Sequence, residues 1–230
     1  LSSKIFVVIS ALFLISCNGN SPTHDQPSLM QKSAKRGVSF NFTNIQDLPL
    51  LSPAISWSYN WANDQNSTSA LWFDTNEMDF CPMCWNGSYS AAKIRQYVQE
   101  HPNTKYLLGF NEPNLTDQCN MTPAQAAEQW PQVVALAREL NLKLISPAMN
   151  YGTLAGYHDP IKWLDEFFAQ PNVSLDDIHA IAIHCYMASP SAVKDYIKRF
   201  EKYGKPIWMT EFCAWDPVPS NVEKQMDYMC

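Results

Sequence analysis

Short apolar runs alternate with longer segments of helical periodicity along most of the chain, and this alternation constrains the fold more than any other feature of the sequence. The expected strands occupy residues 36–42, 54–61, 78–85, 105–113, 143–150, 180–187 and 206–213. The expected helices occupy residues 88–101, 122–141, 160–170 and 189–204. Strands that are apolar along their length and separated by helices form a parallel sheet that is buried on both faces.

Local signals at the ends of the helical segments support this interpretation. Thr122 precedes Pro123, and Gln125 stands at the capping-box position, so the sequence predicts a helix start at this point. Ser90 is a candidate N-cap for the segment 88–101, and Gly204 is a candidate C-cap for the segment 189–204.

Seven strands of this kind fit either an open doubly wound sheet or most of a (β/α)8 TIM barrel. A nucleotide-binding open sheet would usually have a glycine-rich phosphate loop after its first strand, and none is found here. Polar and aromatic residues instead gather at the carboxyl ends of nearly all the strands, which line the active face of a barrel. They are Trp57, Asn60, Trp61, Met83, Trp85, Asn111, Glu112, Met149, Asn150, His184, Tyr186 and Glu211. We therefore expect an α/β barrel over residues 36–230, truncated after strand seven because no eighth strand follows.

The first 17 residues have the composition of a signal peptide. Lys4 precedes about a dozen apolar residues, which are too few to span a membrane as a helix. The following residues "LISC" (14–17) resemble a bacterial lipobox, in which Cys17 becomes the lipidated N-terminus; the alternative is an ordinary secretory signal cleaved near Ser16. Residues 18–35 are polar and are expected to form a flexible tether. These features predict an exported protein, either a lipoprotein at the outer membrane or cell surface or a secreted one.

Composition limits the ligands. The net charge is −6 and the chain has no long basic run, which argues against a nucleic-acid partner. Eight Trp and ten Tyr residues favour a neutral ligand with an apolar face, although aromatic side chains are more often found in cores and interfaces.

Cysteine spacing raises the question of a metal site. The motif "CPMC" places Cys81 and Cys84 at the spacing of half a zinc ribbon, but no second close Cys or His pair follows. We therefore expect no metal. The six cysteines other than Cys17 are expected to be buried free thiols or to form one or two disulfides, with a pairing that the sequence leaves open.

Two apolar strands end on glutamates, and this pair indicates the chemistry. "YLLGFNEP" runs into Glu112, and "IWMTEF" runs into Glu211. A single glutamate at a strand tip could be held there by a structural salt bridge. Two such residues at one face of a barrel match the pair that glycoside hydrolysis needs, one carboxyl group protonated and the other ionised.

The motifs around these glutamates resemble a known family. "GFNEP" and "TEF" look like the acid/base and nucleophile motifs of the barrel hydrolases with glutamates on strands four and seven. With "WSYNW" (57–61), "FCPMCW" (80–85), "SPAMN" (146–150) and "AIHCY" (182–186), the chain from Arg36 to Trp215 resembles glycoside hydrolase family 128, the β-1,3-glucanases with an asl1-like catalytic domain. Family members often carry a Trp where Cys185 stands.

The resemblance implies roles for individual residues. Glu112 would be the general acid/base and Glu211 the nucleophile of a retaining double displacement, with carboxyl groups about 5 to 5.5 Å apart. Asn111 would bind the sugar 2-hydroxyl group, and His184 and Tyr186 would position the nucleophile. The substrate subsites would be lined by Trp57, Asn60, Trp61, Met83 and Trp85. No cofactor would be needed, and the partner would be a β-glucan bound by a monomer.

Two alternatives stay open at this point. One is a related barrel hydrolase that acts on another β-glycan, such as a xylan or a mannan. The other is a surface lipoprotein that binds glycans and has lost catalysis.

Overall fold

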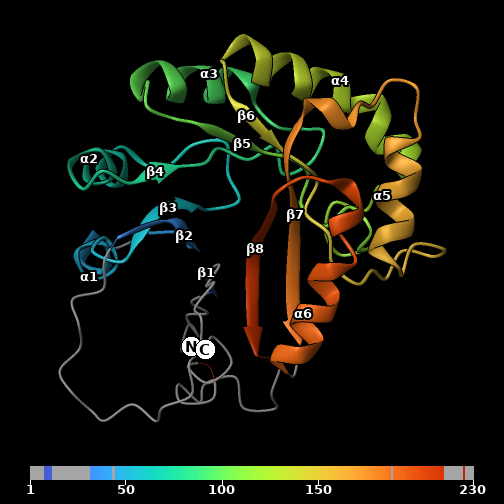
Figure 1. The fold of residues 1–230 in the computed structure, drawn as a ribbon. Coiled ribbons are helices and arrows are strands. Elements are labelled where there is room, and N and C mark those ends of the chain that lie inside the picture. The colour runs from blue at the N-terminus through green and yellow to red at the C-terminus, as the bar shows by residue number, and fades with distance from the viewer. Residues whose placement is uncertain (1–7, 12–31, 43–44, 188, 215–224, 226–230) are drawn as a thin grey trace.

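The computed structural model describes residues 8–11, 32–42, 45–187, 189–214 and 225, and its centre is a curled sheet whose strands are parallel with one exception (Figure 1). The parallel strands are β2 (Ser33–Ser39), β3 (Ile55–Tyr59), β4 (Asp79–Phe80), β5 (Tyr106–Leu108), β6 (Lys143–Ile145), β7 (Ile178–Met187) and β8 (Ile207–Ala214). Neighbouring strands pair in chain order. The pairs are β2 with β3, β3 with β4, β5 with β6, β6 with β7, and β7 with β8. All seven strands expected from the sequence are therefore found.

A bridge between the segment after β4 and the end of β5 joins the two halves of the sheet. Met83 pairs in parallel with Leu108, and the backbone N–H of Cys84 donates to the carbonyl of Leu108 at 2.9 Å. The order of strands is thus continuous from β2 to β8, and their carboxyl ends point the same way.

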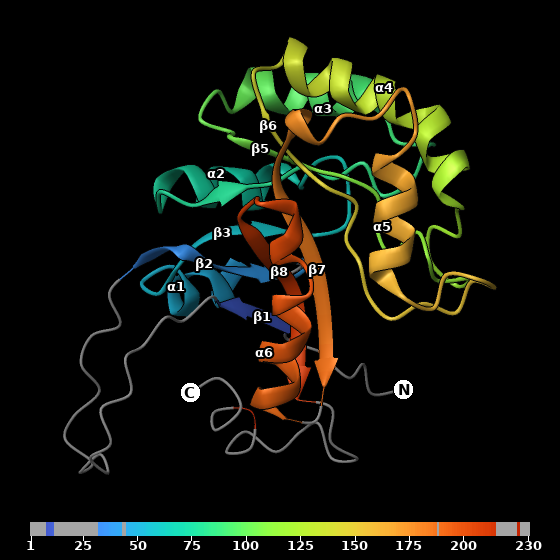
Figure 2. The same cartoon turned by 45° about the vertical axis from the view of Figure 1, so that its right-hand side comes forward.

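Helices cover the outside of this sheet (Figures 1 and 2). They are α1 (Leu48–Leu51), α2 (Ser67–Thr75), α3 (Ala91–Glu100), α4 (Pro123–Glu139), α5 (Pro160–Phe168) and α6 (Pro190–Lys198), with short 3-10 helices at Ile45–Asp47, Leu175–Asp177 and Glu201–Tyr203. The four helices expected from the sequence are α3 to α6. The capping box of Thr122 and Gln125 is formed, and Ser90 caps α3. The expected helix 189–204 is divided: α6 ends with Arg199 as its C-cap, and Gly204, with a left-handed φ of 62°, caps the 3-10 helix Glu201–Tyr203.

Side chains of alternate strand residues fill two separate layers. One cluster contains only residues of strands and of the segments after them, including Tyr59, Leu108, Ile145, Ala180 and Ala182, so it fills the concave inside of the curled sheet. The neighbours in sequence, Leu107, Leu144, Ile181 and Ile183, belong to the cluster shared with α3 to α6. A third cluster packs β2 to β4 against α1 and α2. This alternation decides which strand residues can face a site inside the sheet.

The structure contains one strand that the sequence did not predict. Val8–Ala11, within the expected signal segment, form strand β1, which pairs antiparallel with β2 and also contacts β8. β1 is the one antiparallel strand of the sheet among the described residues, and it was not anticipated because its apolar run has neither the period nor the flanking turns of the other strands. Within the described ranges, no helix has both the length and the apolar character needed to cross a bilayer.

Two further elements, the helices α1 and α2, were not predicted from the sequence. α1 and α2 lie between β2 and β4 in a region where no helix was expected. α2 begins at Asn66, whose side chain accepts a hydrogen bond from the backbone N–H of Ser69, but its exposed Leu71 and buried Phe73 give no clear apolar stripe. The expected strand 78–85 is regular over Asp79–Phe80 alone.

Candidate active site

Glu112 lies beyond the regular part of β5, in an extension that still follows the sheet. Asn111 forms an isolated parallel bridge with Ala148, and the backbone N–H of Glu112 donates to the carbonyl of Ala148 at 3.1 Å. Glu112 itself has φ 43°, a backbone conformation that is uncommon for residues other than glycine and is concentrated at functional sites. The turn leaves the side chain 6% exposed.

The carboxyl group of Glu112 is held by two neighbouring strands. Its Oε1 accepts a hydrogen bond of 3.1 Å from Nδ2 of Asn150, which follows β6. The same oxygen lies 2.9 Å from Nδ1 of His184, near the end of β7. Glu112 is therefore fixed at the carboxyl ends of three adjacent strands.

Glu211 in β8 is surrounded by donors. Its Oε1 accepts hydrogen bonds from the hydroxyl group of Tyr59 at 2.9 Å and from Nε1 of Trp61 at 2.7 Å. Its Oε2 accepts one from the hydroxyl group of Tyr186 at 2.5 Å. Trp61 lies two residues after β3 and has a positive φ of 60°.

These contacts set the charge of Glu211. Burial raises the pKa of its carboxyl group, but His184 and the three donors lower it by more, so the pKa of Glu211 lies below its ordinary value. At neutral pH the residue is an ionised carboxylate in a buried setting.

His184 connects the two glutamates. It is fully buried, and its Nδ1 lies 2.9 Å from Oε1 of Glu112 while its Nε2 lies 3.5 Å from Oε1 of Glu211. Burial lowers the pKa of the imidazole, but the charges of Glu211 and Glu112 raise it by more, so that it lies above the ordinary value of 6.5. The imidazole therefore lies in contact with both carboxyl groups.

Asn111 directly precedes Glu112, and one of the two polar atoms of its side-chain amide is hydrogen-bonded. Nδ2 donates to Oε1 of Gln118 at 3.0 Å, which fixes the orientation of the side chain. Oδ1 is buried and has no hydrogen-bond partner among the described residues. A buried acceptor left unpaired is costly unless a ligand uses it.

Asn114, two residues after Glu112, forms hydrogen bonds with the loop that contains Asn150. It is fully buried, and its Nδ2 donates to the carbonyls of Asn150 at 2.8 Å and Tyr157 at 3.2 Å. Its own carbonyl accepts from the backbone N–H groups of Thr153 and Leu154. The segments after β5 and β6 are thereby joined.

Three of the residues expected to line subsites contact other parts of the protein. Trp57 is 6% exposed and stacks on Trp208 with ring centroids 5.3 Å apart, and Gly37 leaves the space that its ring fills. Met83 is 2% exposed inside the sheet. Asn60 accepts from the N–H of Ala62 and donates to the carbonyl of Asp64, so its amide shapes the turn after β3. Their role in lining subsites stays a prediction.

Trp85 and Trp61 remain half-buried at the carboxyl ends of their strands. The carbonyl of Trp85 accepts from the N–H of Asn111, which places this tryptophan next to the segment of Glu112. Cys185 points to the opposite side of β7, into the cluster with Tyr196 and Phe200, so its difference from the family pattern lies on the helix side of the sheet.

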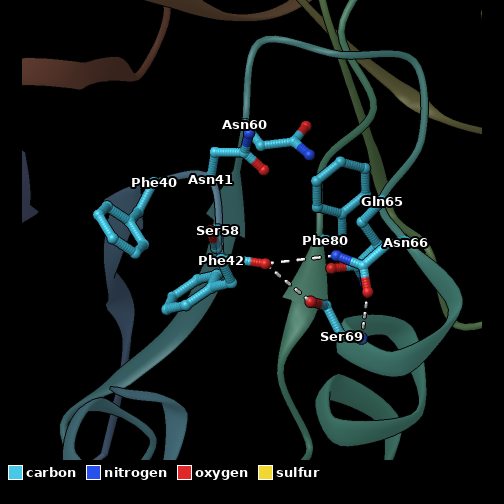
Figure 3. Close-up of a pocket in the computed structure, with 9 residues that line it drawn as sticks. All are labelled: Phe40, Asn41, Phe42, Ser58, Asn60, Gln65, Asn66, Ser69 and Phe80. Atoms are coloured by element: carbon cyan, nitrogen blue, oxygen red, sulfur yellow. Dashed lines mark hydrogen bonds between the residues drawn. The ribbon is translucent and has the colours of Figure 1, made fainter. Parts of the chain in front are cut away.

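A small pocket near Asn60 is separate from the glutamates (Figure 3). Asn66 and Ser69 both donate side-chain hydrogen bonds to the carbonyl of Phe42, so the polar groups here tie the end of β2 to the start of α2. The pocket is lined by Phe40, Asn41, Phe42, Ser58, Asn60, Gln65, Asn66, Ser69 and Phe80. We assign it a structural role.

Sequence reasoning missed three residues that contact the site. Tyr59 could have been found from its position in "WSYNW", because residues 57, 59 and 61 share one face of a strand. Asn150 was recognised at a strand end without a role. Gln118 follows the strand by several residues and gave no signal.

The cysteines support no metal centre in the part of the chain that the structure describes. Cys81 and Cys84 are buried free thiols whose pKa values are raised by burial. Among the described residues, no group of His, Cys, Asp and Glu side chains is arranged to hold a metal ion. Cys17, the expected lipidation site, lies outside the described residues.

Two buried glutamates at the carboxyl ends of parallel strands, one of them held ionised, form the arrangement on which glycoside hydrolases depend. Comparison with known proteins gives the same class. The family described as "Glycosyl hydrolase catalytic core" matches residues 37–230. The chain therefore belongs to this family, the glycoside hydrolases of family 128.

Individual relatives agree with this assignment. A crystal structure of a family 128 (subgroup II) endo-β-1,3-glucanase from Pseudomonas viridiflava is 37% identical, with a TM-score of 0.78 over 86% of this chain and 80% of that one. The corresponding enzyme from Sorangium cellulosum is 31% identical, with a TM-score of 0.72 over 86% and 79% of the two chains. Alkali-sensitive linkage protein 1 of Schizosaccharomyces pombe is 31% identical over 185 residues, which are 78% of this chain and 30% of that protein. The chain thus spans about a third of the length of this curated relative.

Proposed function

We propose that the protein hydrolyses β-1,3-glucan with retention of configuration, with Glu112 as general acid/base and Glu211 as nucleophile. The observation that carries this proposal is the unequal setting of the two carboxyl groups. Glu211 has three side-chain donors from β3 and β7 and a lowered pKa, as an attacking carboxylate needs. The choice of substrate is supported by the endo-β-1,3-glucanase activity named for the two bacterial relatives.

The reaction would proceed in two displacements. Protonated Glu112 gives its proton to the glycosidic oxygen while Glu211 attacks the anomeric carbon, which releases the leaving sugar and forms a glycosyl-enzyme. Glu112, now ionised, takes a proton from water, and that water releases the second sugar. We expect the carboxyl groups to stand about 5 to 5.5 Å apart, as retention requires.

Asn111 and His184 have supporting roles in this scheme. The unpaired Oδ1 of Asn111 is left to accept a hydrogen bond from the sugar 2-hydroxyl group, an interaction that strengthens in the transition state. His184 contacts both carboxyl groups, so it holds their relative position and shares in their change of charge. Trp61 and Trp85 are proposed to contact the sugar, because both indole rings are half-buried at the carboxyl ends of their strands.

The whole protein is proposed to be a complete (β/α)8 barrel that works as a monomer. The seven parallel strands are wound in the order that such a barrel requires. Residues 1–17 are proposed to be a signal peptide with lipidation at Cys17, and residues 18–35 a tether to the membrane. Incorporation of labelled fatty acid into the wild-type chain but not into Cys17→Ser would support the lipid anchor.

Azide rescue tests the assignment of the two glutamates. The substrate is 2,4-dinitrophenyl β-laminaribioside, whose leaving group needs no proton. With Glu112→Ala the glycosyl-enzyme still forms, and azide attacks it to give the β-glycosyl azide. With Glu211→Ala azide replaces the carboxylate and gives the α-glycosyl azide. Both variants should lose at least about 100-fold in hydrolysis of unactivated glucan, whereas Glu128→Gln on the exposed side of α4 should match the wild type.

Product analysis tests the reaction itself. Linear β-1,3-glucan, β-1,4-glucan, xylan and mannan are supplied separately, and the first anomer released is followed by NMR. Release of the β-anomer from β-1,3-glucan alone supports the proposal. Release of the α-anomer would overturn retention. Tight glycan binding without release, in a protein shown to be folded, would mean that the protein captures glycans.

A further inference from the structure

Tyr151 is an exposed aromatic residue next in sequence to Asn150, which contacts the candidate acid/base. It is 51% exposed and lies in the segment between β6 and α5. Its backbone N–H donates to Oδ1 of Asn150 at 2.8 Å, and Nδ2 of the same asparagine donates to Glu112 at 3.1 Å. The other exposed large apolar residues among the described ones, Leu50 and Leu71, lie on α1 and α2. Tyr151 therefore differs from them in being tied to the site.

The ring of Tyr151 is held in place by Tyr196 on α6 and by Arg199 at the C-cap of that helix, and Arg199 is in turn held by Asp159 at the N-cap of α5. Its centroid is 5.3 Å from that of Tyr196, with 40° between the planes. Nη1 of Arg199 donates to its hydroxyl group at 3.2 Å. Both carboxylate oxygens of Asp159 accept from Nη2 of Arg199 at 2.7 Å. A ring fixed in this way loses little conformational entropy when a ligand binds.

The chemistry of this surface suits a sugar. A flat aromatic face can cover the apolar C–H face of a glucose ring, and Tyr loses few rotamers in doing so. Arg199 and Asp159 are 34% and 48% exposed, so each still has surface with which to bind hydroxyl groups at the edge of the ring. Aromatic contact area with a few fixed polar groups is the general composition of a ligand site.

The position of Tyr151 indicates which end of the substrate it would meet. The acid/base gives its proton to the oxygen of the departing sugar, so the departing part of the chain lies on the side of Glu112. The side-chain contacts of Glu112 come from β7 and from Asn150 after β6, whereas those of Glu211 come from β3 and β7. The segment after β6 thus borders the leaving-group side.

We propose that Tyr151, supported by Arg199 and Asp159, forms a subsite for a glucose unit on the leaving-group side of the scissile bond. The inference rests on the proposed function, and it names a residue that selects for chain length beyond the cleavage point. It predicts that the protein distinguishes substrates by the sugar units that are released with the leaving group.

Two substrates separate this role from a general effect on catalysis. Laminarihexaose can place glucose units on both sides of the cleavage point. β-Laminaribiosyl fluoride has a leaving group that is too small to reach a sugar subsite. Tyr151→Ala and Tyr151→Leu are compared with Tyr151→Phe, which keeps the ring, and with Leu71→Ala as a control for the loss of an exposed apolar side chain. All are made in the full chain, and thermal unfolding is recorded for each.

The Ala and Leu variants should lose about tenfold in kcat/KM on laminarihexaose and remain within about twofold of wild type on the fluoride. Tyr151→Phe and Leu71→Ala should resemble the wild type on both. An equal loss of kcat/KM on both substrates would mean that the ring only stabilises the loop that contains Asn150. Unchanged kinetics on both substrates would show that Tyr151 forms no subsite. Failure of the wild type itself to cleave laminarihexaose would overturn the proposed function, and this inference with it.

Discussion

The hydroxyl group of Tyr186 donates a 2.5 Å hydrogen bond to Oε2 of Glu211, across two neighbouring parallel strands. Tyr186 lies two residues after His184 on β7, so both side chains point to the inside of the sheet. One strand therefore supplies a neutral donor and a basic group to the same carboxylate. Substitution of each residue in turn separates these contributions.

Tyr186→Phe removes the donor and keeps the ring. We expect kcat/KM on β-1,3-glucan to fall about 10- to 100-fold, because a hydrogen bond to a charged group contributes about 1.5–3 kcal/mol. The bond also lowers the pKa of Glu211. Because Glu211 must be ionised to attack, loss of this hydrogen bond should move the acidic limb of the kcat/KM profile to higher pH. A variant with reduced activity and an unmoved acidic limb would contradict this account.

His184→Gln tests the coupling between the imidazole and the two glutamates. The pKa of His184 is raised in the folded protein, so its protonation stabilises the fold. That contribution is fully present below the unfolded pKa of about 6.5 and is lost as pH rises through the folded pKa. We expect the variant to lose more stability at pH 6 than at pH 9.

The measurement is urea unfolding of both proteins at the two pH values. Tyr97→Phe serves as the control, because its buried ring on α3 also stacks on a histidine, His101, which contacts neither glutamate by a hydrogen bond or ion pair. A loss of stability in His184→Gln that is the same at both pH values would show that the imidazole acts by packing alone.

The sequence predicted most of the sheet because burial on both faces leaves a continuous apolar run. It also singled out Glu112 and Glu211, because a carboxylate at the end of such a run has few structural reasons to be there, and the structure brings both against His184. α2 was missed, since its exposed Leu71 and buried Ala70 and Phe73 form no periodic stripe. Here tertiary packing decides the structure, and local propensity does not.

Depth along a strand could not be predicted from the sequence. Trp57 and Trp61 share a face of the same segment, yet Trp57 packs on Trp208 and Trp61 donates to Glu211. Trp57 lies within β3, whereas Trp61 follows the strand with φ 60°. The alternation of side chains along the segment does not predict such a turn.

Trp163 provides a prediction on stability that is independent of catalysis. It is fully buried on α5, stacks on Phe167 at 5.0 Å, and donates from Nε1 to the carbonyl of Met121 at 2.9 Å. Trp163→Phe should cost about 1–3 kcal/mol, because it leaves a buried carbonyl unpaired. Trp163→Ala should cost about 3–5 kcal/mol. Urea unfolding checks both, and the exposed Leu71→Ala should stay within about 0.5 kcal/mol of wild type.

Asn114→Ala tests whether the segment after β6 positions the acid/base. The side chain of Asn114 holds the carbonyl of Asn150, and Nδ2 of Asn150 holds Glu112. Loss of Asn114 should displace that amide and weaken proton donation. We expect kcat/KM on laminarihexaose to fall at least about tenfold, and that on 2,4-dinitrophenyl β-laminaribioside to change by less than about threefold, because its glycosylation step needs no proton.

A merely structural role for Asn114 would lower activity on both substrates together, by reducing the amount of folded protein. Thr116→Ala is the matched control, because Thr116 joins the same two segments through Thr153 without reaching Asn150. If the two variants show the same loss on laminarihexaose, the connection between the segments matters and the specific path through Asn150 does not. A selective loss in Asn114→Ala alone means that the buried amide acts on the acid/base from outside the substrate site.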